Sequence, residues 1–533
     1  MKIVIVGGGA GGASCAARLR RLSNDLEITV LEKTNETSMA SCGLPYYIGD
    51  VIDNRDVMQV ASPQLFKDLF AIDVLLNHEA VKINVQDKNV QTVFGDVFPY
   101  DKLVLSLGAG ACVPPITGLD KIPYFTVKTL ADADRIKDYI KTNNPKSVAV
   151  IGGGFIGVET AENMVHLGLE TSLIDLSDQV LDPLDKDMVC QIHGAMRENG
   201  VDLILSDCVR EFTNDKIILS SGKEVAADFV VMAAGITPET KLAKEAGIAV
   251  NAKGYIKTNE FMQTNVQDIY ACGDSVEVKD FVSGVDTAIA LAGPANRQGR
   301  QIADHIAGAP YAYTGTQGTG VVKVFGLTAA FTGNNEKQLQ ASGCEFEKMI
   351  VWAFSHAGYY PDPKPLALKV LYNKNGKILG AQAVGAEGAD KRIDVIATIM
   401  RLNGTIKDLR DAELCYAPPY SSAKDVINIA GMAIENVQNG LTKPYFGTDF
   451  SGALVIDVRP ADVFALGHIP GAVNIPGGIL RSKLADIPKD KPIVICCRRG
   501  YNSYVAGRTL ADLGVDVYNY AGGFWQYNAL TKL

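Results

Sequence analysis

The sequence predicts an α/β protein with four folded parts: two nested βαβ folds, an α+β interface part and a small terminal α/β part. An apolar strand pattern runs through a glycine-rich turn into a helix-like segment within residues 2–22, and the same order recurs within residues 147–167. Alternating strand patterns then precede an amphipathic stretch at residues 391–402. Strands alternate with helical segments again near the C-terminus, which is typical of a last small α/β part.

Composition limits what kind of protein this is. A chain of 533 residues is too long for one hydrophobic core. With 47% apolar and 21% charged residues it is typical of globular proteins, and its net charge of −9 argues against a nucleic-acid partner. We find no secretory signal pattern and no run of about eighteen apolar residues, so we expect no membrane association. Ten scattered cysteines suit free thiols in a reducing compartment, and we predict a cytoplasmic protein.

The glycine turns both fit the pattern G-x-G-x-x-G. In such a turn the glycines allow a tight bend and let the backbone approach a pyrophosphate at the helix N-terminus, while an acid beyond it binds a ribose. The two sets are Gly7, Gly9 and Gly12 with Glu32 beyond, and Gly152, Gly154 and Gly157 with Asp175 beyond. Two complete sets imply two different dinucleotides.

The order of the strands predicts nested domains. Apolar strands at residues 104–107 and 229–233 indicate that the first fold is interrupted by the second and resumes near residue 251. A stretch rich in Gly, Thr and Pro at residues 440–447 predicts a linker. The expected domains are residues 1–112 with 251–319, 113–250, 320–440 and 450–533.

Residues 1–440 resemble the pyridine nucleotide-disulfide oxidoreductase family. Besides the two glycine turns, residues 105–109 are similar to the motif that joins its two folds, and residues 264–274 match its second FAD motif. The resemblance implies Rossmann-like domains, with FAD in the first and NAD(P)H in the second, and a dimerisation domain. The cofactor-binding residues that it implies are Gly7, Gly9, Gly12, Glu32, Lys33, Gly108, Gly152, Gly154, Gly157, Glu159, Asp175, Gly273, Asp274 and Ala290.

The resemblance also bears on the choice of nicotinamide cofactor. Asp175 would bind the adenosine ribose, and no arginine that would favour a 2′-phosphate lies within residues 176–184. NADH is therefore favoured, and NADPH remains possible.

Cys42 is the expected redox cysteine. Family members with two redox cysteines have four residues between them, but position 47 is Tyr here, which places the chain in the single-cysteine branch of coenzyme A-disulfide reductases, NADH oxidases and NADH peroxidases. Oxidases and peroxidases commonly have His where this chain has Ala10, which disfavours peroxide chemistry. Gly43 and Pro45 predict a helix start, whose dipole we expect, with the flavin, to favour the thiolate.

Two tyrosine-containing segments resemble those of the coenzyme A-disulfide reductases. They lie at residues 356–361 and 416–421, and the resemblance implies that tyrosines approach the cysteine of the partner subunit in a homodimer. We predict Tyr360 and Tyr420 as catalytic, with Tyr359 and Tyr416 as alternatives. For coenzyme A as substrate or bound ligand, the resemblance implies binding by Arg18, Arg21, Ser38, Ser41, Asn296 and Arg300.

The last part of the chain resembles a single rhodanese domain. Residues 455–459, 467–472 and 497–502 carry the similarity, which implies that Cys497 opens a loop whose amides surround a persulfide, while Cys496 ends a strand. Arg498 and Arg499 add positive charge that we expect to depress the thiol pKa. Asn502 stands where arginine is common in that family.

The preferred function is a reductase of coenzyme A disulfide, coenzyme A persulfide or polysulfide. The resemblance implies hydride transfer from NADH to FAD and electron delivery to a mixed disulfide between Cys42 and coenzyme A or another sulfane-sulfur carrier. One alternative is an NADH oxidase or peroxidase that cycles Cys42 through sulfenic acid. Another is a redox sensor that uses its rhodanese-like domain for binding and not for catalysis. The sequence does not rank the disulfide, the persulfides of coenzyme A and glutathione, and polysulfide as substrates.

Overall fold

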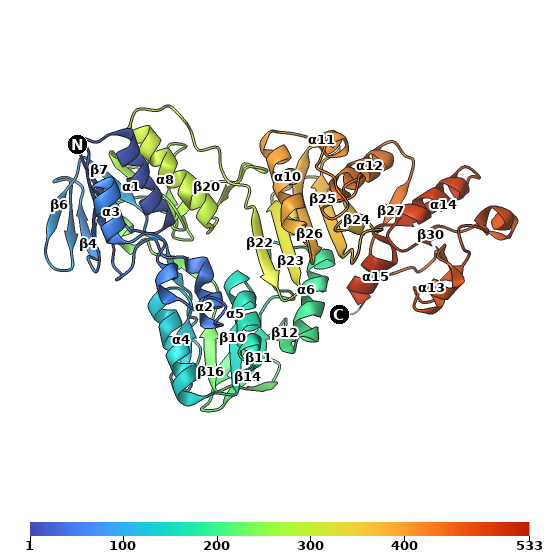
Figure 1. Cartoon of the computed structure of the whole chain (residues 1–533), viewed down its shortest axis with the longest axis horizontal. Coiled ribbons are helices and arrows are strands. Elements are labelled where there is room, and N and C mark those ends of the chain that lie inside the picture. Colours follow the sequence, from blue (N-terminus) through green and yellow to red (C-terminus); the bar gives the residue numbers. More distant parts are fainter. Residues whose placement is uncertain (532–533) are drawn as a thin grey trace. The chain divides into compact units, whose positions relative to one another are not determined.

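The computed structural model describes residues 1–531, and the chain divides into two compact units. Unit 1 comprises Met1–Asp178 and Val201–Thr316, and unit 2 comprises Gln179–Gly200 and Gln317–Leu533. Figure 1 draws the chain with its helices and strands labelled. Both units combine helices with sheets, which confirms the predicted α/β class.

The first sheet of unit 1 is parallel, with the strand order β19-β7-β1-β2-β3. This is the order of a dinucleotide-binding fold. The neighbouring strands β7 and β19 come from segments that lie far apart in the chain, so the first fold is interrupted and resumes, as predicted. The strands are β1 (Lys2–Val6), β2 (Glu27–Leu31), β3 (Asp73–Leu75), β7 (Lys102–Leu105) and β19 (Ile269–Ala271).

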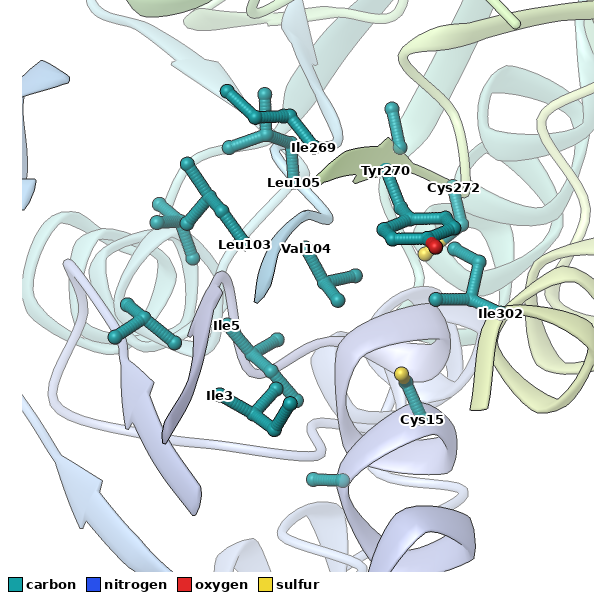
Figure 2. Packing of buried hydrophobic residues seen from close by; sticks show 14 of the residues in the cluster. Ile3, Ile5, Cys15, Leu103, Val104, Leu105, Ile269, Tyr270, Cys272 and Ile302 are labelled. Atoms are coloured by element: carbon teal, nitrogen blue, oxygen red, sulfur yellow. The ribbon is translucent and has the colours of Figure 1, made fainter. Parts of the chain in front are cut away.

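Helices α1 (Ala10–Leu22) and α8 (Ala292–Ile306) lie side by side in unit 1 (Figure 1). Figure 2 shows the core beneath them, where apolar side chains of the sheet meet those of the two helices. The strands are apolar at nearly every position because helices and loops cover the sheet on both faces. The residues labelled there are Ile3, Ile5, Cys15, Leu103, Val104, Leu105, Ile269, Tyr270, Cys272 and Ile302.

The second sheet of unit 1 repeats this design with the parallel order β12-β11-β10-β16-β9. Its strands are β9 (Tyr124–Thr126), β10 (Ser147–Ile151), β11 (Glu170–Ile174), β12 (Val201–Ile204) and β16 (Phe229–Met232). The helices of this fold in unit 1 are α4 (Leu130–Asn143) and α5 (Phe155–His166). The second dinucleotide fold is therefore present where the glycine pattern predicted it.

Unit 2 is built on an antiparallel sheet with the order β22-β23-β26-β25-β24. Helices α6 (Lys186–Glu198), α10 (Ala389–Arg401) and α12 (Val426–Gln438) pack on it. Its strands are β22 (Gly320–Val324), β23 (Leu327–Gly333), β24 (Glu347–Phe354), β25 (Pro365–Tyr372) and β26 (Ile378–Gly385). This is the predicted α+β interface domain.

A parallel sheet with the order β27-β31-β30-β28-β29 forms the terminal part of unit 2. Strand β27 lies within the stretch expected to be a linker, so that stretch is not wholly a linker: residues 443–445 pair with β31. The strands are β27 (Lys443–Tyr445), β28 (Leu454–Asp457), β29 (Val473–Asn474), β30 (Ile493–Cys496) and β31 (Val517–Tyr520), and the helices are α13 (Ala461–Ala465), α14 (Tyr501–Ala511) and α15 (Gly523–Thr531).

Smaller elements complete the described chain. Within residues 1–531 no helix combines the length and apolarity needed to cross a bilayer. The shorter helices are α2 (Leu44–Ile48), α3 (Pro63–Phe70), α7 (Lys241–Glu245), α9 (Glu336–Ala341) and α11 (Ile406–Asp411), and the minor sheets contain β4 (Ala80–Asn84), β5 (Asn89–Thr92), β6 (Val97–Pro99), β8 (Ala109–Ala111), β13 (Val209–Phe212), β14 (Lys216–Leu219), β15 (Glu224–Ala226), β17 (Ile236–Pro238), β18 (Ile256–Lys257), β20 (Val276–Lys279) and β21 (Asp286–Thr287).

A buried lysine ties α6 to the interface sheet. Lys369 on β25 is fully buried, and its ammonium group contacts Asp185 at 2.9 Å, Asp187 at 2.6 Å and Glu336. A buried charge is tolerated only when it is paired and hydrogen-bonded, which these three carboxylates provide. The network therefore fixes the start of α6 on the interface sheet.

We predict that Lys369→Met destabilises unit 2 by about 3–5 kcal/mol, because three carboxylates lose the buried charge that compensates them. Urea unfolding followed by tryptophan fluorescence measures this, since both tryptophans, Trp352 and Trp525, lie in unit 2. Lys348→Met is the matched control, because Lys348 also pairs with Glu336 but is 25% exposed. Equal losses of unfolding free energy in the two variants would contradict the claim that the buried charge of Lys369 stabilises unit 2.

Candidate active site

The glycine loop after β1 has the geometry of a pyrophosphate cradle. Gly7 has a φ of 100°, and a Cβ there would lie 2.1 Å from the Ser106 carbonyl oxygen. A Cβ on Gly12 would lie 2.0 Å from the Gly7 carbonyl oxygen, so the helix and the strand pack without side chains between them. Gly9, in contrast, has open space within 4 Å of its Cβ position. These are the three roles that the glycines of a dinucleotide site fulfil.

The loop after β10 repeats this geometry. Gly152 has a φ of 111°, and its Cβ would lie 2.3 Å from the Ala233 carbonyl oxygen. A Cβ on Gly157 would lie 1.9 Å from the Gly152 carbonyl oxygen, while Gly154 faces open space. Both loops therefore fit a dinucleotide.

An acid follows the second strand of each fold and holds its glycine loop. Glu32 accepts hydrogen bonds from the N–H of Gly8 at 2.7 Å and of Thr34 at 2.9 Å. Asp175 accepts from the N–H of Gly153 and, at 2.6 Å, from that of Ser177. Each carboxylate thus lies beside its cradle, where an acid can accept a hydrogen bond from a ribose hydroxyl.

The other expected cofactor residues also lie in unit 1. Lys33 forms an ion pair with Glu239, and Gly108 has a φ of 71° with open space at its Cβ position. The Gly273 N–H donates to the Gln298 side chain at 2.8 Å. Ala290 is exposed. Nothing in this geometry conflicts with cofactor binding by these residues, which remains a prediction for each.

Cys42 lies where the chain turns into a helix. It sits in a 3-10 turn, Ser41–Gly43, that runs directly into α2, and Pro45 occupies the first turn of that helix. Cys42 is a free, exposed thiol, and Tyr47 occupies the position of a second redox cysteine. The helix start predicted from Gly43 and Pro45 is therefore present.

The protein around Cys42 does not favour its thiolate. Desolvation by neighbouring atoms, then the carboxylates of Glu159 and Asp274, raise the pKa of the Cys42 thiol. A hydrogen bond with Ser41 and the charge of Lys128 act in the opposite direction but do not offset this. In the polypeptide alone, desolvation and then carboxylates distant in sequence outweigh any effect of the helix start. The expectation that the helix start favours the thiolate together with the flavin stays a prediction.

Glu159, on the first turns of α5, is the most perturbed acid near the cysteine. Desolvation and the neighbouring Glu162 raise its pKa to about 7, although a hydrogen bond from the Tyr46 hydroxyl, at 3.1 Å, lowers it. Strongly shifted acids of this kind cluster at functional sites. Sequence reasoning missed Tyr46, although it lies four residues after Cys42 in a predicted helix and so could have been expected on the same helix face.

Three of the six residues expected to bind coenzyme A, namely Arg18, Asn296 and Arg300, make side-chain contacts on α1 and α8. The Arg18 side chain contacts Asp304 at 2.7 Å, Arg300 lies 3.6 Å from the same carboxylate, and Ser14 donates to Asn296 at 2.7 Å. The remaining three are more dispersed. Arg21 is exposed at the end of α1, Ser41 adjoins Cys42, and the Ser38 N–H donates to the Gly8 carbonyl oxygen.

The four tyrosines lie in unit 2, on two loops that contact each other. The hydroxyls of Tyr359 and Tyr416 form a hydrogen bond, which joins the two alternatives. Tyr360 packs edge-on against His356, at 5.5 Å between ring centroids, and Tyr420 is 72% exposed.

Cys497 opens a loop between β30 and α14, as predicted. Its sulfur accepts the Gly500 N–H at 3.2 Å and lies 3.3 Å from the Ser503 hydroxyl. Cys496 ends β30 and packs into the cluster on the other side of the sheet, with Val494 and Tyr520. The loop thus directs polar hydrogens at one cysteine only, and Ser503 is a contact that sequence reasoning missed.

Comparison with known proteins agrees with this geometry. The chain belongs to the pyridine nucleotide-disulphide oxidoreductase family, whose model matches residues 1–299. The dimerisation domain of that family matches residues 319–434, and the rhodanese-like domain matches residues 447–530. The protein is therefore a flavoprotein oxidoreductase that uses FAD and NAD(P)H, with a rhodanese-like domain at its end.

One curated relative and two solved structures are similar to this chain over most of its length. A coenzyme A disulfide reductase of Staphylococcus haemolyticus is 35% identical over 437 residues, which are 81% of this chain and 98% of the relative. The structure of reduced Bacillus anthracis CoADR-RHD covers 100% of this chain and 98% of its own, with 44% identity and a TM-score of 0.97. The structure of a NAD-dependent persulfide reductase from A. fulgidus covers 99% of this chain and 100% of its own, with 34% identity and a TM-score of 0.95.

We predict that Glu159→Gln lowers the pKa of Cys42. The thiol titrates above the pKa of Glu159, so the carboxylate is charged during that titration and opposes the thiolate. The pH dependence of Cys42 alkylation by iodoacetamide measures this, with Glu170→Gln on the exposed start of β11 as the control. An unchanged or higher pKa in the Glu159 variant would refute the assignment.

Proposed function

We propose that this protein reduces coenzyme A disulfide or coenzyme A persulfide with NAD(P)H, using Cys42 as its single redox cysteine. The observation that carries the proposal is Cys42 itself: a free thiol at a helix start, with Tyr47 in place of a second cysteine, in the fold that holds both dinucleotide cradles. Two of the relatives that match over nearly their whole length are named for coenzyme A disulfide reduction and for persulfide reduction.

The chain's own residues divide the work of binding. The loops at Gly9 and Gly154 present open backbone to the two pyrophosphates, and Glu32 and Asp175 accept hydrogen bonds from ribose hydroxyls. When bound, FAD and NAD(P)H supply the two-electron chemistry. The polypeptide contributes position, charge and the reacting sulfur.

Cys42 carries out the sulfur exchange. Its thiolate attacks one sulfur of coenzyme A disulfide, which forms a mixed disulfide and releases one coenzyme A thiolate. Glu159, with a pKa of about 7, holds a proton close to this exchange near neutral pH. Arg18, Arg21 and Arg300 on α1 and α8 supply positive charge for the phosphates of coenzyme A, and Ser38, Ser41 and Asn296 supply polar contacts.

We propose that sulfane-sulfur donors enter at Cys497. The Gly500 N–H and the Ser503 hydroxyl at its sulfur suit a persulfide anion. Asn502, where the family commonly has arginine, leaves Arg498 and Arg499 as the nearby charges for the donor. A rhodanese-like domain has no part in an oxidase that reduces oxygen, and Ala10 provides no imidazole for a sulfenic acid, so the reductase is favoured over that rival.

The remaining features extend the proposal. The dimerisation domain supports a homodimer, in which Tyr360 and Tyr420, or the hydrogen-bonded pair Tyr359 and Tyr416, approach the redox cysteine of the partner subunit.

The ten cysteines are all free, which suits a cytoplasmic location. We propose domains at residues 1–112 with 251–319, 113–250 and 320–440, and a terminal domain that starts at β27 rather than at residue 450.

The first test separates the two cysteines. Cys42→Ser should keep its bound FAD but lose reduction of coenzyme A disulfide, whereas Cys497→Ser should lose sulfurtransferase activity and keep reduction of preformed coenzyme A persulfide. Cys496→Ser should affect neither, because its side chain packs on the other side of the sheet. Steady-state assays of both activities decide this, and a Cys42 variant that reduces the disulfide at the normal rate would reject the proposal.

The second test concerns the nicotinamide cofactor. We expect NADH to have a specificity constant about ten- to a hundredfold above that of NADPH, because Asp175 would face the extra phosphate without a compensating charge. Asp175→Asn should reduce this ratio. A higher specificity constant for NADPH in the intact protein would contradict this account of the site.

A further inference from the structure

Arg499, two residues after Cys497, packs against aromatic rings. Its guanidinium carbon lies 4.7 Å from the ring centroid of Phe354 and 5.8 Å from the ring of Trp525. Phe354 ends β24 of the interface domain, whereas Trp525 belongs to α15 of the terminal domain. These contacts, which we call the arginine clamp, link the cysteine loop to two elements that lie far apart in the sequence.

The rings of the clamp are held in place by their neighbours. Trp525 meets Phe354 edge-on, with 5.5 Å between centroids, and meets Trp352 in the same manner at 5.7 Å. The Trp352 indole N–H donates to the side-chain oxygen of Gln526 at 2.8 Å, and Gln526 is only 2% exposed. The rings against which Arg499 packs are therefore themselves packed against, or hydrogen-bonded to, other side chains.

The helix that carries Trp525 is also bonded to the cysteine loop. The N–H groups of Phe524 and Trp525 donate to the carbonyl oxygens of Cys497 and Arg498, at 2.7 and 3.1 Å. Gly523 has a φ of 64°, and a Cβ there would lie 2.6 Å from the Arg499 nitrogen. Because no side chain fits between α15 and the cysteine loop, the position of the helix fixes the position of the loop.

The sulfur lies on the inner side of this loop. Cys497 is only 4% exposed, and the N–H that donates to its sulfur belongs to Gly500, the residue after Arg499. A displacement of Arg499 would therefore move this donor.

We propose that Arg499 is a positioning residue for sulfur transfer: held by Phe354 and Trp525, it keeps the Gly500 N–H directed at the Cys497 sulfur. The inference rests on the proposed role of Cys497 and extends it, because the interface domain becomes part of the sulfur-transfer site. The Cys497 thiolate takes the outer sulfur of thiosulfate, which yields the persulfide and sulfite, and cyanide then takes that sulfur as thiocyanate and restores the thiolate.

The positioning role of Arg499 is tested by substitutions that remove either its planar guanidinium group or the ring of Trp525. Lysine at position 499 keeps the charge but has no planar group to lie along the rings. Arg499→Lys and Trp525→Leu should each lower the kcat of thiocyanate formation by about tenfold, the effect of losing one partly buried cation–π contact. Arg498→Lys, at the exposed neighbouring position, should lose much less than Arg499→Lys, and Trp525→Phe should retain most of the activity because it keeps a ring.

A second measurement does not depend on sulfur transfer. Loss of the clamp should expose Cys497, so its alkylation by iodoacetamide, followed by peptide mass spectrometry, should speed up by about tenfold in Arg499→Lys and Trp525→Leu but not in Trp525→Phe. Unchanged alkylation in both of the first two variants would overturn the proposal. Faster alkylation in them, with no thiocyanate formed even by the intact protein, would support the clamp and reject the proposed function of Cys497.

Discussion

Two close backbone contacts determine where the chemistry of unit 1 can take place. The Gly7 carbonyl meets the backbone of Gly12, and the Gly152 carbonyl meets that of Gly157, so closely that neither helix position can carry a Cβ. Each contact brings a helix N-terminus over the end of a strand and leaves open backbone in the middle of the loop. The acids after the second strands, Glu32 and Asp175, accept hydrogen bonds from these loops, and Glu159 lies two residues after Gly157 on the same helix.

The environment of Cys42 follows from this arrangement. Desolvation, and then the carboxylates of the two folds, Glu159 and Asp274, raise the pKa of the Cys42 thiol, so the polypeptide alone disfavours the thiolate. The thiolate is the reactive form toward disulfides and toward peroxide alike, so this raised pKa slows both reactions and does not distinguish them. The feature of this site that favours sulfur exchange over sulfenic acid chemistry is Ala10, which stands where oxidases and peroxidases commonly have a histidine.

The sequence was sufficient for features that depend on neighbouring residues. The strand, glycine turn and helix at residues 2–22 and 147–167, the helix start after Cys42 and the loop after Cys496 were all predictable from local patterns. Contacts between distant residues were not. Glu159 lies more than a hundred residues from Cys42, and Phe354 lies similarly far from Arg499, so neither the raised pKa nor the arginine clamp leaves a local signal. Strand β27 is too short, and interrupted by a proline, to be distinguished from a linker.

The central claim, that Cys42 exchanges with sulfur substrates rather than oxygen, is tested most directly by NADH oxidation measured without oxygen. Coenzyme A disulfide, coenzyme A persulfide, polysulfide and glutathione persulfide should be compared in that assay, with oxygen and hydrogen peroxide as separate acceptors. The account predicts rapid NADH oxidation with at least one coenzyme A substrate and little with oxygen or peroxide. NADH oxidation that proceeds only with oxygen or peroxide would contradict it.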